Sequence, residues 1–223
     1  MTAPIRVLLV DDQELIRVGF RLVLDAEADI DVVGEAGDGE AAVDAVRRTR
    51  PDVVLMDVRM PRTDGIAATA RIVAEMPTTR VLVLTTFDLD EYAFGALDAG
   101  ASGFLLKDAR RDELTAAVRA IHRGDAVLSP RVTRELISRA SRLAPADSAS
   151  RLVASLTERE RDVFLAMGRG LTNAEIAASL FLGESTVKTH VGRILAKLGA
   201  RDRVHAVILA HRSGLVGPAD PLP

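Results

Sequence analysis

Short apolar runs alternate with amphipathic segments over the first 124 residues. The apolar runs are Ile5–Val10, Asp31–Ala36, Asp52–Met56, Arg80–Leu84 and Gly103–Leu106. Four of them are rich in β-branched residues and show no polar alternation, which is expected of strands that are covered on both faces. The segments with apolar residues at helical spacing are Glu14–Asp25, Asp38–Arg48, Asp64–Met76, Asp90–Ala99 and Arg110–His122. Five consecutive strand–helix units predict an α/β domain, a doubly wound five-stranded parallel sheet with helices on both faces.

The pattern changes after Gly124. Residues 125–150 carry small, polar and proline residues, as is typical of a linker, and a short helix is expected at Pro130–Ser141. No strand pattern remains after Arg151. Helices are expected to start at Thr157 and Thr172, each followed three residues later by glutamate as in a capping box. Two more are expected at Ser185–Leu198 and Asp202–Ser213. The expected organisation is an α/β domain over 1–124, a linker over 125–150, a small all-α domain over 151–217 and a tail over 218–223.

Charge is distributed unevenly between the two expected domains. The chain has 223 residues and a net charge of −3, yet residues 1–124 carry a net −7 and residues 151–223 a net +3. An acidic half joined to a basic half favours metal or phosphoryl chemistry in the first and an anionic partner for the second. The absence of cysteine excludes disulfide scaffolds and thiol catalysis. No apolar run is long enough to span a membrane, and no secretion signal is visible, so we expect a soluble, cytoplasmic protein.

Three carboxylates fall at the ends of predicted strands. Asp11 and Asp12 come directly after the first strand, and Asp57 comes directly after the third. Ligand sites in open α/β sheets form beyond the carboxyl ends of the strands. A cluster of acids at that edge repels itself unless a hard cation joins it, and such oxygen ligands suit Mg²⁺. The sequence therefore predicts a magnesium site.

Two further polar residues stand at the ends of the fourth and fifth predicted strands. Thr85 follows the fourth strand and Lys107 the fifth, where a hydroxyl and an ammonium can hold phosphoryl oxygens. One carboxylate could then accept a phosphoryl group. Taken singly, each Asp is more often a cap or turn residue, and Lys107 a surface charge. A phosphatase of the haloacid dehalogenase type would need a second Asp two residues after the nucleophile. The residue two positions after Asp57 is Arg59, which excludes this class of enzyme.

These residues lie in segments that resemble a two-component receiver domain, which has a flavodoxin-like fold. The matching features are Asp11-Asp12, Leu55–Pro61 with Asp64-Gly65, Thr85 and Gly100–Lys107. The resemblance implies that Asp57 accepts phosphate from a histidine kinase. It implies that Asp11, Asp12, Asp57 and the backbone carbonyl of Arg59 bind Mg²⁺. It also implies that Lys107 and Thr85 contact the phosphoryl group, and that Thr85 and Phe104 change on activation. Phe104 could equally be a core aromatic, and Asp108 stands where many receivers have proline.

Two of the later helices, Thr172–Leu180 and Ser185–Leu198, are separated by a short turn with Gly183, which is typical of a helix-turn-helix. Their apolar residues would close a small core: Ile176, Ala177, Leu180, Val187, Val191, Ile194 and Leu198. The outer face of the second helix then carries hydroxyls and cations, which suits entry into the major groove of DNA. Any three-helix scaffold would show the same period, so the period alone leaves DNA binding open.

The local sequence of this half is more specific than its period. The segments Leu156–Glu160, Gly170–Ala177, Ser185–Val191 and Ile194–Leu198 resemble a LuxR-type DNA-binding domain, in the same order. With the receiver-like half, the whole chain is similar to a NarL/FixJ-type response regulator. The resemblance implies that Lys188, Thr189 and Arg193 face bases or nearby phosphates.

The same resemblance implies contacts of Thr172, Ser185 and Thr186 with backbone phosphates. Gly192 stands where a polar side chain often reaches a base, so we expect either fewer direct contacts with bases or relaxed specificity at one base step. The stripe Val204, Val207 and Ile208 of the last helix either pairs two copies of the chain, as in the family, or closes the domain core.

The resemblance implies a two-component transcription regulator. Mg-dependent phosphoryl transfer from a sensor histidine kinase to Asp57 would switch sequence-specific binding to double-stranded promoter DNA. Homodimerisation is expected on phosphorylation, with RNA polymerase as a candidate partner, and catalysis would be confined to the chain's own phosphorylation and dephosphorylation. Two alternatives are a DNA-binding regulator with a degenerate receiver, against which the complete acidic set argues, and an adaptor that binds no DNA.

Overall fold

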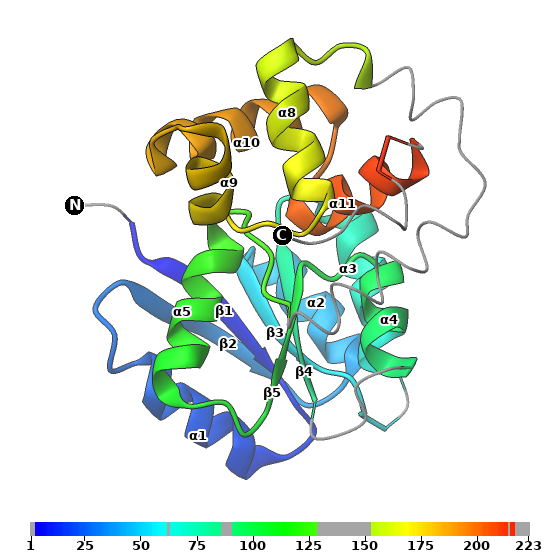
Figure 1. Ribbon diagram of the computed structural model, residues 1–223. Coiled ribbons are helices and arrows are strands. Elements are labelled where there is room, and N and C mark those ends of the chain that lie inside the picture. The colour runs from blue at the N-terminus through cyan, green and yellow to red at the C-terminus, as the bar shows by residue number, and fades with distance from the viewer. Residues whose placement is uncertain (1–2, 62, 86–90, 129–152, 214, 217–223) are drawn as a thin grey trace. The chain divides into compact units, whose positions relative to one another are not determined.

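The chain forms two compact units, residues 1–128 and 129–223, shown in Figure 1. The structure is a computed structural model that describes residues 3–61, 63–85, 91–128, 153–213 and 215–216. The helix expected at Pro130–Ser141 and the tail expected over 218–223 lie outside the described residues.

The first unit alternates strands and helices as predicted. Its strands are β1 (Ile5–Val10), β2 (Ile30–Ala36), β3 (Val53–Asp57), β4 (Arg80–Thr85) and β5 (Gly103–Leu106). Its helices are α1 (Glu14–Leu24), α2 (Gly39–Thr49), α3 (Gly65–Glu75), α4 (Glu91–Asp98) and α5 (Arg111–His122). The sheet is parallel throughout with the strand order β2-β1-β3-β4-β5. This confirms the predicted doubly wound sheet, whose order reverses between β1 and β3.

Helices cover both faces of this sheet, with α1 and α5 on one side and α2, α3 and α4 on the other (Figure 1). One face buries Val7, Leu9, Val53, Leu55 and Leu82 together with residues of α1 and α5. The intervening residues of the same strands are also buried, which are Leu8, Val10, Val54, Met56, Val81 and Val83. Burial on both faces is why these strands read as continuous apolar runs.

The strand ends differ from the predicted ones by single residues. Asp57 is the last residue of β3 instead of the first residue after it, because Asp57 still pairs with Leu84 of β4. Thr85 likewise belongs to β4 and pairs with Leu106. The functional side chains are therefore held by the sheet itself, which fixes their backbone more firmly than a loop would.

The described part of the second unit is helical. Its helices are α8 (Glu158–Gly168), α9 (Asn173–Leu180), α10 (Glu184–Leu198) and α11 (Arg203–Arg212). Both predicted capping boxes are present, because the hydroxyls of Thr157 and Thr172 accept from the backbone N–H three residues later. The predicted apolar core is confirmed, with Ile176, Val187 and Ile194 fully buried.

The turn between α9 and α10 differs from the expected one. Its left-handed residue is Phe181, with φ 53°, and its side chain is 96% exposed. Gly183 has an ordinary extended backbone and caps α10, which begins at Glu184, one residue earlier than predicted. The glycine in the turn is therefore not required by a positive φ.

The last helix meets the core of this unit through small residues. Ala206 and Ala210 of α11 belong to that core. Two residues of the stripe, Val204 and Val207, are also buried, with exposed fractions of 2% and 6%. The stripe is therefore not a free apolar surface in this structure, and the pairing of two copies through it stays a prediction.

Candidate functional site

The acidic residues of the first unit meet at the carboxyl edge of the sheet. Asp11 directly follows β1 and Asp57 ends β3, and both are almost fully buried, whereas Asp12 is exposed. One carboxylate oxygen from each of the three lies within 4.8 Å of the others. β1 and β3 are neighbours in the sheet, so the ends of two adjacent strands contribute to one cluster. The structure thus brings together the three acids that the sequence selected.

Lys107 extends into this cluster from the end of β5. Its Nζ lies 2.6 Å from Asp11 Oδ2 and 3.0 Å from Asp57 Oδ2, and its side chain is only 7% exposed. The backbone N–H of Lys107 donates to the Thr85 carbonyl at 2.8 Å, which continues the β4–β5 pairing by one residue. One ammonium therefore bridges two buried carboxylates.

The pKa values of the pocket follow from this arrangement. Burial raises the pKa of Asp57 above its ordinary value, although Lys107 and the backbone N–H of Arg59 oppose the rise. Burial lowers the pKa of Lys107, but its contacts with Asp11 and Asp57 outweigh burial, so the net shift is upward. Lys107 stays cationic at neutral pH and partly neutralises the acids.

The remaining predicted residues of this pocket lie nearby in the fold. Thr85 is buried at the end of β4, one residue past the partner of Asp57. Phe104 is buried in β5 and pairs with Val83. Arg59 is exposed, and its backbone N–H donates to the Asp57 carboxylate. Their roles in binding and switching stay predictions.

Gly39 and Gly65 allow two helix starts to lie against the backbone of the loop after β3. The sequence analysis missed the role of both glycines. A Cβ on Gly65 would lie 2.0 Å from the Asp57 carbonyl oxygen, and its N–H donates to Val58 at 2.9 Å. A Cβ on Gly39 would lie 2.6 Å from the Thr63 carbonyl oxygen. The sequence showed an Asp-Gly pair before each helix, but not that both helix starts press against this loop.

The predicted DNA-contact residues lie on the exposed face of α10 and at the start of α9. Ser185, Thr186, Lys188, Thr189 and Arg193 are all exposed. The Thr189 hydroxyl donates to the Ser185 carbonyl at 3.0 Å, and Lys188 pairs with Glu184 at 3.1 Å. The α10 surface therefore carries two cations and three hydroxyls that protein packing does not cover.

Thr172 caps α9, so its hydroxyl already takes part in a hydrogen bond within the protein. Its hydroxyl accepts from the Glu175 N–H at 3.2 Å, and its own N–H donates to the Glu175 carboxylate at 2.6 Å. The backbone N–H of Thr172, and after it the hydroxyl, lower the pKa of Glu175 by hydrogen bonding. The phosphate contact of Thr172 stays a prediction.

Glu160 joins the start of α8 to the end of α10. Its Oε2 accepts from Lys197 Nζ at 2.6 Å and from the Thr157 N–H at 2.8 Å. These partners, Lys197 foremost, lower the pKa of Glu160 to about 2. The ion pair is structural and places the C-terminal part of α10 against α8.

We expect the acid sensitivity of the second unit to depend on Glu160. Because its pKa falls from 4.5 to about 2 on folding, its contribution is complete above pH 4.5 and is lost as the pH falls toward 2. Thermal unfolding of the chain and of Glu160→Gln between pH 7 and pH 2 would test this. The stability difference between them should shrink below pH 4.5, and a constant difference would contradict the assignment.

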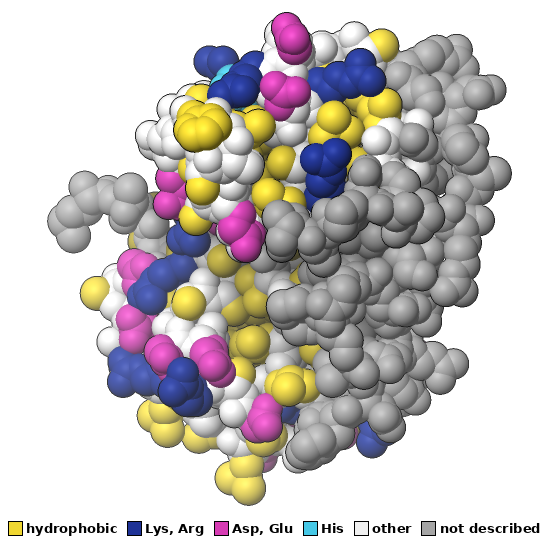
Figure 2. Space-filling model, viewed as in Figure 1, with side chains coloured by type: hydrophobic (Ala, Val, Ile, Leu, Met, Phe, Trp, Pro, Cys, Tyr) yellow, Lys and Arg dark blue, Asp and Glu magenta, His cyan; other side chains and the backbone are white. Residues whose placement is uncertain are grey.

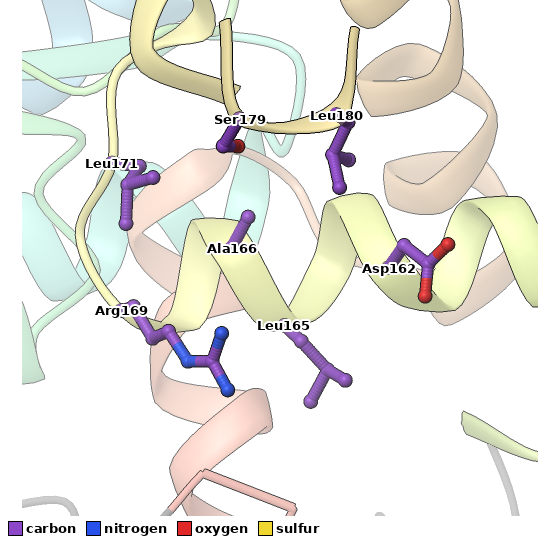
Figure 3. A pocket seen from close by; sticks show the side chains of 7 residues that line it. All are labelled: Asp162, Leu165, Ala166, Arg169, Leu171, Ser179 and Leu180. Carbon is purple, nitrogen blue, oxygen red and sulfur yellow. The ribbon is translucent and has the colours of Figure 1, made fainter. Parts of the chain in front are cut away.

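A groove lies between α8 and α9 in the second unit, with a volume of about 360 Å³ (Figure 3). Its walls are apolar, with charged residues at the α8 rim, and the lining residues are Asp162, Leu165, Ala166, Arg169, Leu171, Ser179 and Leu180. None of the predicted site residues lines it.

Comparison with known proteins assigns each unit to a protein family. Residues 7–119 match the response regulator receiver domain, and residues 154–210 match the bacterial regulatory proteins of the luxR family. The transcriptional regulatory protein YxjL of Bacillus subtilis is 48% identical over 95% of this chain and 97% of its own length. LiaR of the same organism is 40% identical over 95% of this chain and 99% of its own.

A solved structure extends the match to the whole chain. The response regulator ChrA of a heme-sensing two-component system is 39% identical, with a TM-score of 0.52 over 96% of this chain and 100% of its own. Within the part of the chain that the structure describes, no helix has the length and apolarity needed to cross a membrane.

Proposed function

Because this chain belongs to the response regulators that join a receiver domain to a LuxR-type DNA-binding domain, we propose that Asp57 is its phosphoacceptor and that phosphorylation switches its binding to promoter DNA. The observation that carries this proposal is the pocket in which Asp11, Asp12 and Asp57 converge with Lys107 bridging two of them. The relatives YxjL and LiaR are transcriptional regulatory proteins. The sequence motifs predicted the same family.

The donor set of the pocket fits Mg²⁺. Asp11, Asp12 and Asp57 offer carboxylate oxygens, which are the ligands that this hard cation prefers. Three acids with one bridging ammonium also leave net negative charge for a divalent ion. These residues would hold the ion together with the Arg59 backbone carbonyl, and when bound it supplies positive charge beside the transferred group.

Each residue of the pocket has a different role in the phosphoryl transfer. An Asp57 oxygen forms the bond to phosphorus while the bond to the histidine nitrogen of the donor breaks, and that nitrogen keeps the electron pair. Lys107 is placed to neutralise the phosphoryl oxygens, and Thr85 to donate a hydrogen bond to one of them. The modification biases the chain only as far as its contacts differ between two states, with Thr85 and Phe104 as the responding residues.

The α1 surface supports a protein as the phosphoryl donor. Leu15 is 85% exposed and Leu22 is 70% exposed, and Val18 lies between them on the same helical face. Apolar side chains protrude at the place of α1 in the space-filling view (Figure 2). The helix begins two residues after Asp12, so this face borders the acidic pocket. An exposed apolar face beside a reaction site is typical of a docking surface, here for the kinase.

We expect Leu15→Ala combined with Leu22→Ala to slow phosphoryl transfer from an autophosphorylated histidine kinase about tenfold or more, through lost apolar contact. Labelling by acetyl phosphate should not change, because that donor needs no docking surface. The matched control is Phe181→Ala, which removes an even more exposed apolar side chain from the second unit. Equal loss with both donors would show that the variant damages the pocket instead.

The second unit is proposed to bind duplex DNA through α10. Its exposed Lys188 and Arg193 can meet phosphates or base edges, and Ser185 and Thr186 stand at the first turn, where the positive end of the helix dipole favours anions. The activated chain would bind paired half-sites as a dimer, with the α11 stripe as the candidate contact between copies.

A binding experiment tests this function as a whole. The affinity for DNA fragments from its own upstream region should rise when beryllofluoride and Mg²⁺ are added, and log K should fall with log salt. Equal affinity with and without beryllofluoride would favour a regulator with a degenerate receiver. A salt slope near zero would favour an adaptor that binds no DNA.

A further inference from the structure

Gly192 lies at a position where neither the backbone conformation nor packing among the described residues requires glycine. It lies in the interior of α10 and is exposed, and an added Cβ would meet no atom of the described residues within 4 Å. Its φ is not in the left-handed region that favours glycine. Glycine inside a helix is markedly less favourable than alanine, because it has more backbone freedom to lose on folding. The helix is therefore weakened at this point without any gain in packing.

The surroundings of Gly192 belong to the surface proposed to face DNA. Lys188 and Thr189 lie one turn before it on the same side of α10, and the exposed Ala196 lies one turn after it. Residues at this spacing flank the bare stretch of backbone. A neighbouring duplex could therefore approach the helix more closely at Gly192 than at any residue with a side chain.

The chemistry of that bare stretch limits what it can recognise. In a helix interior the N–H and C=O groups of Gly192 are used by helix hydrogen bonds, so the residue offers no donor or acceptor. Of the groups at base edges in the major groove, the C5-methyl of thymine is the one recognised by apolar contact alone. The gap left by the missing Cβ has the size of one methyl group.

We propose that Gly192 is a specificity-determining residue that receives the methyl group of a thymine in the recognised sequence. This inference rests on the proposed DNA binding. It adds that one recognised base is thymine, and it explains why position 192 is a glycine. Alanine at this position would place its Cβ where the methyl group lies. The variant should then prefer a base without that methyl group.

The test uses the full chain with beryllofluoride and Mg²⁺. A target is first selected from a random duplex library, and each thymine in it is then replaced by uracil, which lacks only the methyl group. For the parent chain, uracil at one position should weaken binding about fourfold, as expected for one buried methyl group. Gly192→Ala should bind the thymine target roughly tenfold more weakly and regain affinity when that same position is uracil.

The matched control is Gly19→Ala in α1, where an added Cβ also meets nothing within 4 Å among the residues that the structure describes. It should keep the affinity and thymine preference of the parent chain. Both variants should unfold at temperatures no lower than the parent, because alanine favours the helix. If Gly192→Ala shows the same affinity and the same uracil profile as the parent, the inference is wrong while DNA binding stands. If the parent selects no sequence at all, the proposed function fails first.

Discussion

Asp57→Asn will take up no phosphate from acetyl phosphate in the presence of Mg²⁺. The amide that replaces the carboxylate is a poor nucleophile and cannot form the acyl phosphate. The shape of the side chain is kept, and the backbone stays paired with β4, so the pocket should remain folded. Labelling measured with radiolabelled acetyl phosphate, or by intact-mass spectrometry, should fall to background.

The matched control is Asp64→Asn. Asp64 lies in the loop that follows β3, but it is exposed and caps α3, and asparagine caps helices equally well. This variant should be labelled like the parent chain. Full labelling of Asp57→Asn would place the acceptor elsewhere and would remove the basis for the proposed switch.

Lys107→Met should change phosphorylation and metal binding in opposite directions. The ammonium neutralises phosphoryl oxygens, so its loss should slow labelling by acetyl phosphate about 10²–10³-fold. The same ammonium lies 2.6 Å from Asp11 and 3.0 Å from Asp57, where it competes with a cation for their oxygens. Its loss should therefore tighten Mg²⁺ binding, on the order of tenfold.

Calorimetric titration suits the metal measurement, because the chain has no tryptophan to report binding by fluorescence. Methionine fills a similar volume as the lysine stem, which limits the change in packing. The matched control is Lys197→Met, which removes a lysine from the second unit and should alter neither quantity. Weaker Mg²⁺ binding by Lys107→Met would mean that Lys107 orients the acids instead of competing for them.

The acidic pocket was predictable because parallel strands end at one edge. Asp11 and Asp57 could be placed together once β1 and β3 were recognised, since neighbouring carboxyl ends of a doubly wound sheet converge. The bridging contact of Lys107 was not predictable in the same way. It depends on β5 being two strands away from β3 and on a long side chain crossing that distance, which only the folded sheet determines.

In the second unit, too, the local features could be predicted from the sequence and the long-range contacts could not. Its capping boxes are local in sequence, so Thr157–Glu160 and Thr172–Glu175 were correctly predicted as helix starts. The partner of Glu160 is Lys197, which lies 37 residues further along the chain. No local pattern links the two, because the contact exists only when α10 packs against α8.

The sequence by itself determined the order of strands and helices, the acids at the sheet edge and the family. Each of these depends on residues that are close in the chain or on the general rules of parallel sheets. The tertiary structure decided that the ammonium of Lys107 joins the acids, why Gly39 and Gly65 must lack side chains, and that packing within the described residues does not require glycine at position 192. Those properties depend on distances between remote segments, where a shift of one ångström separates a contact from a collision.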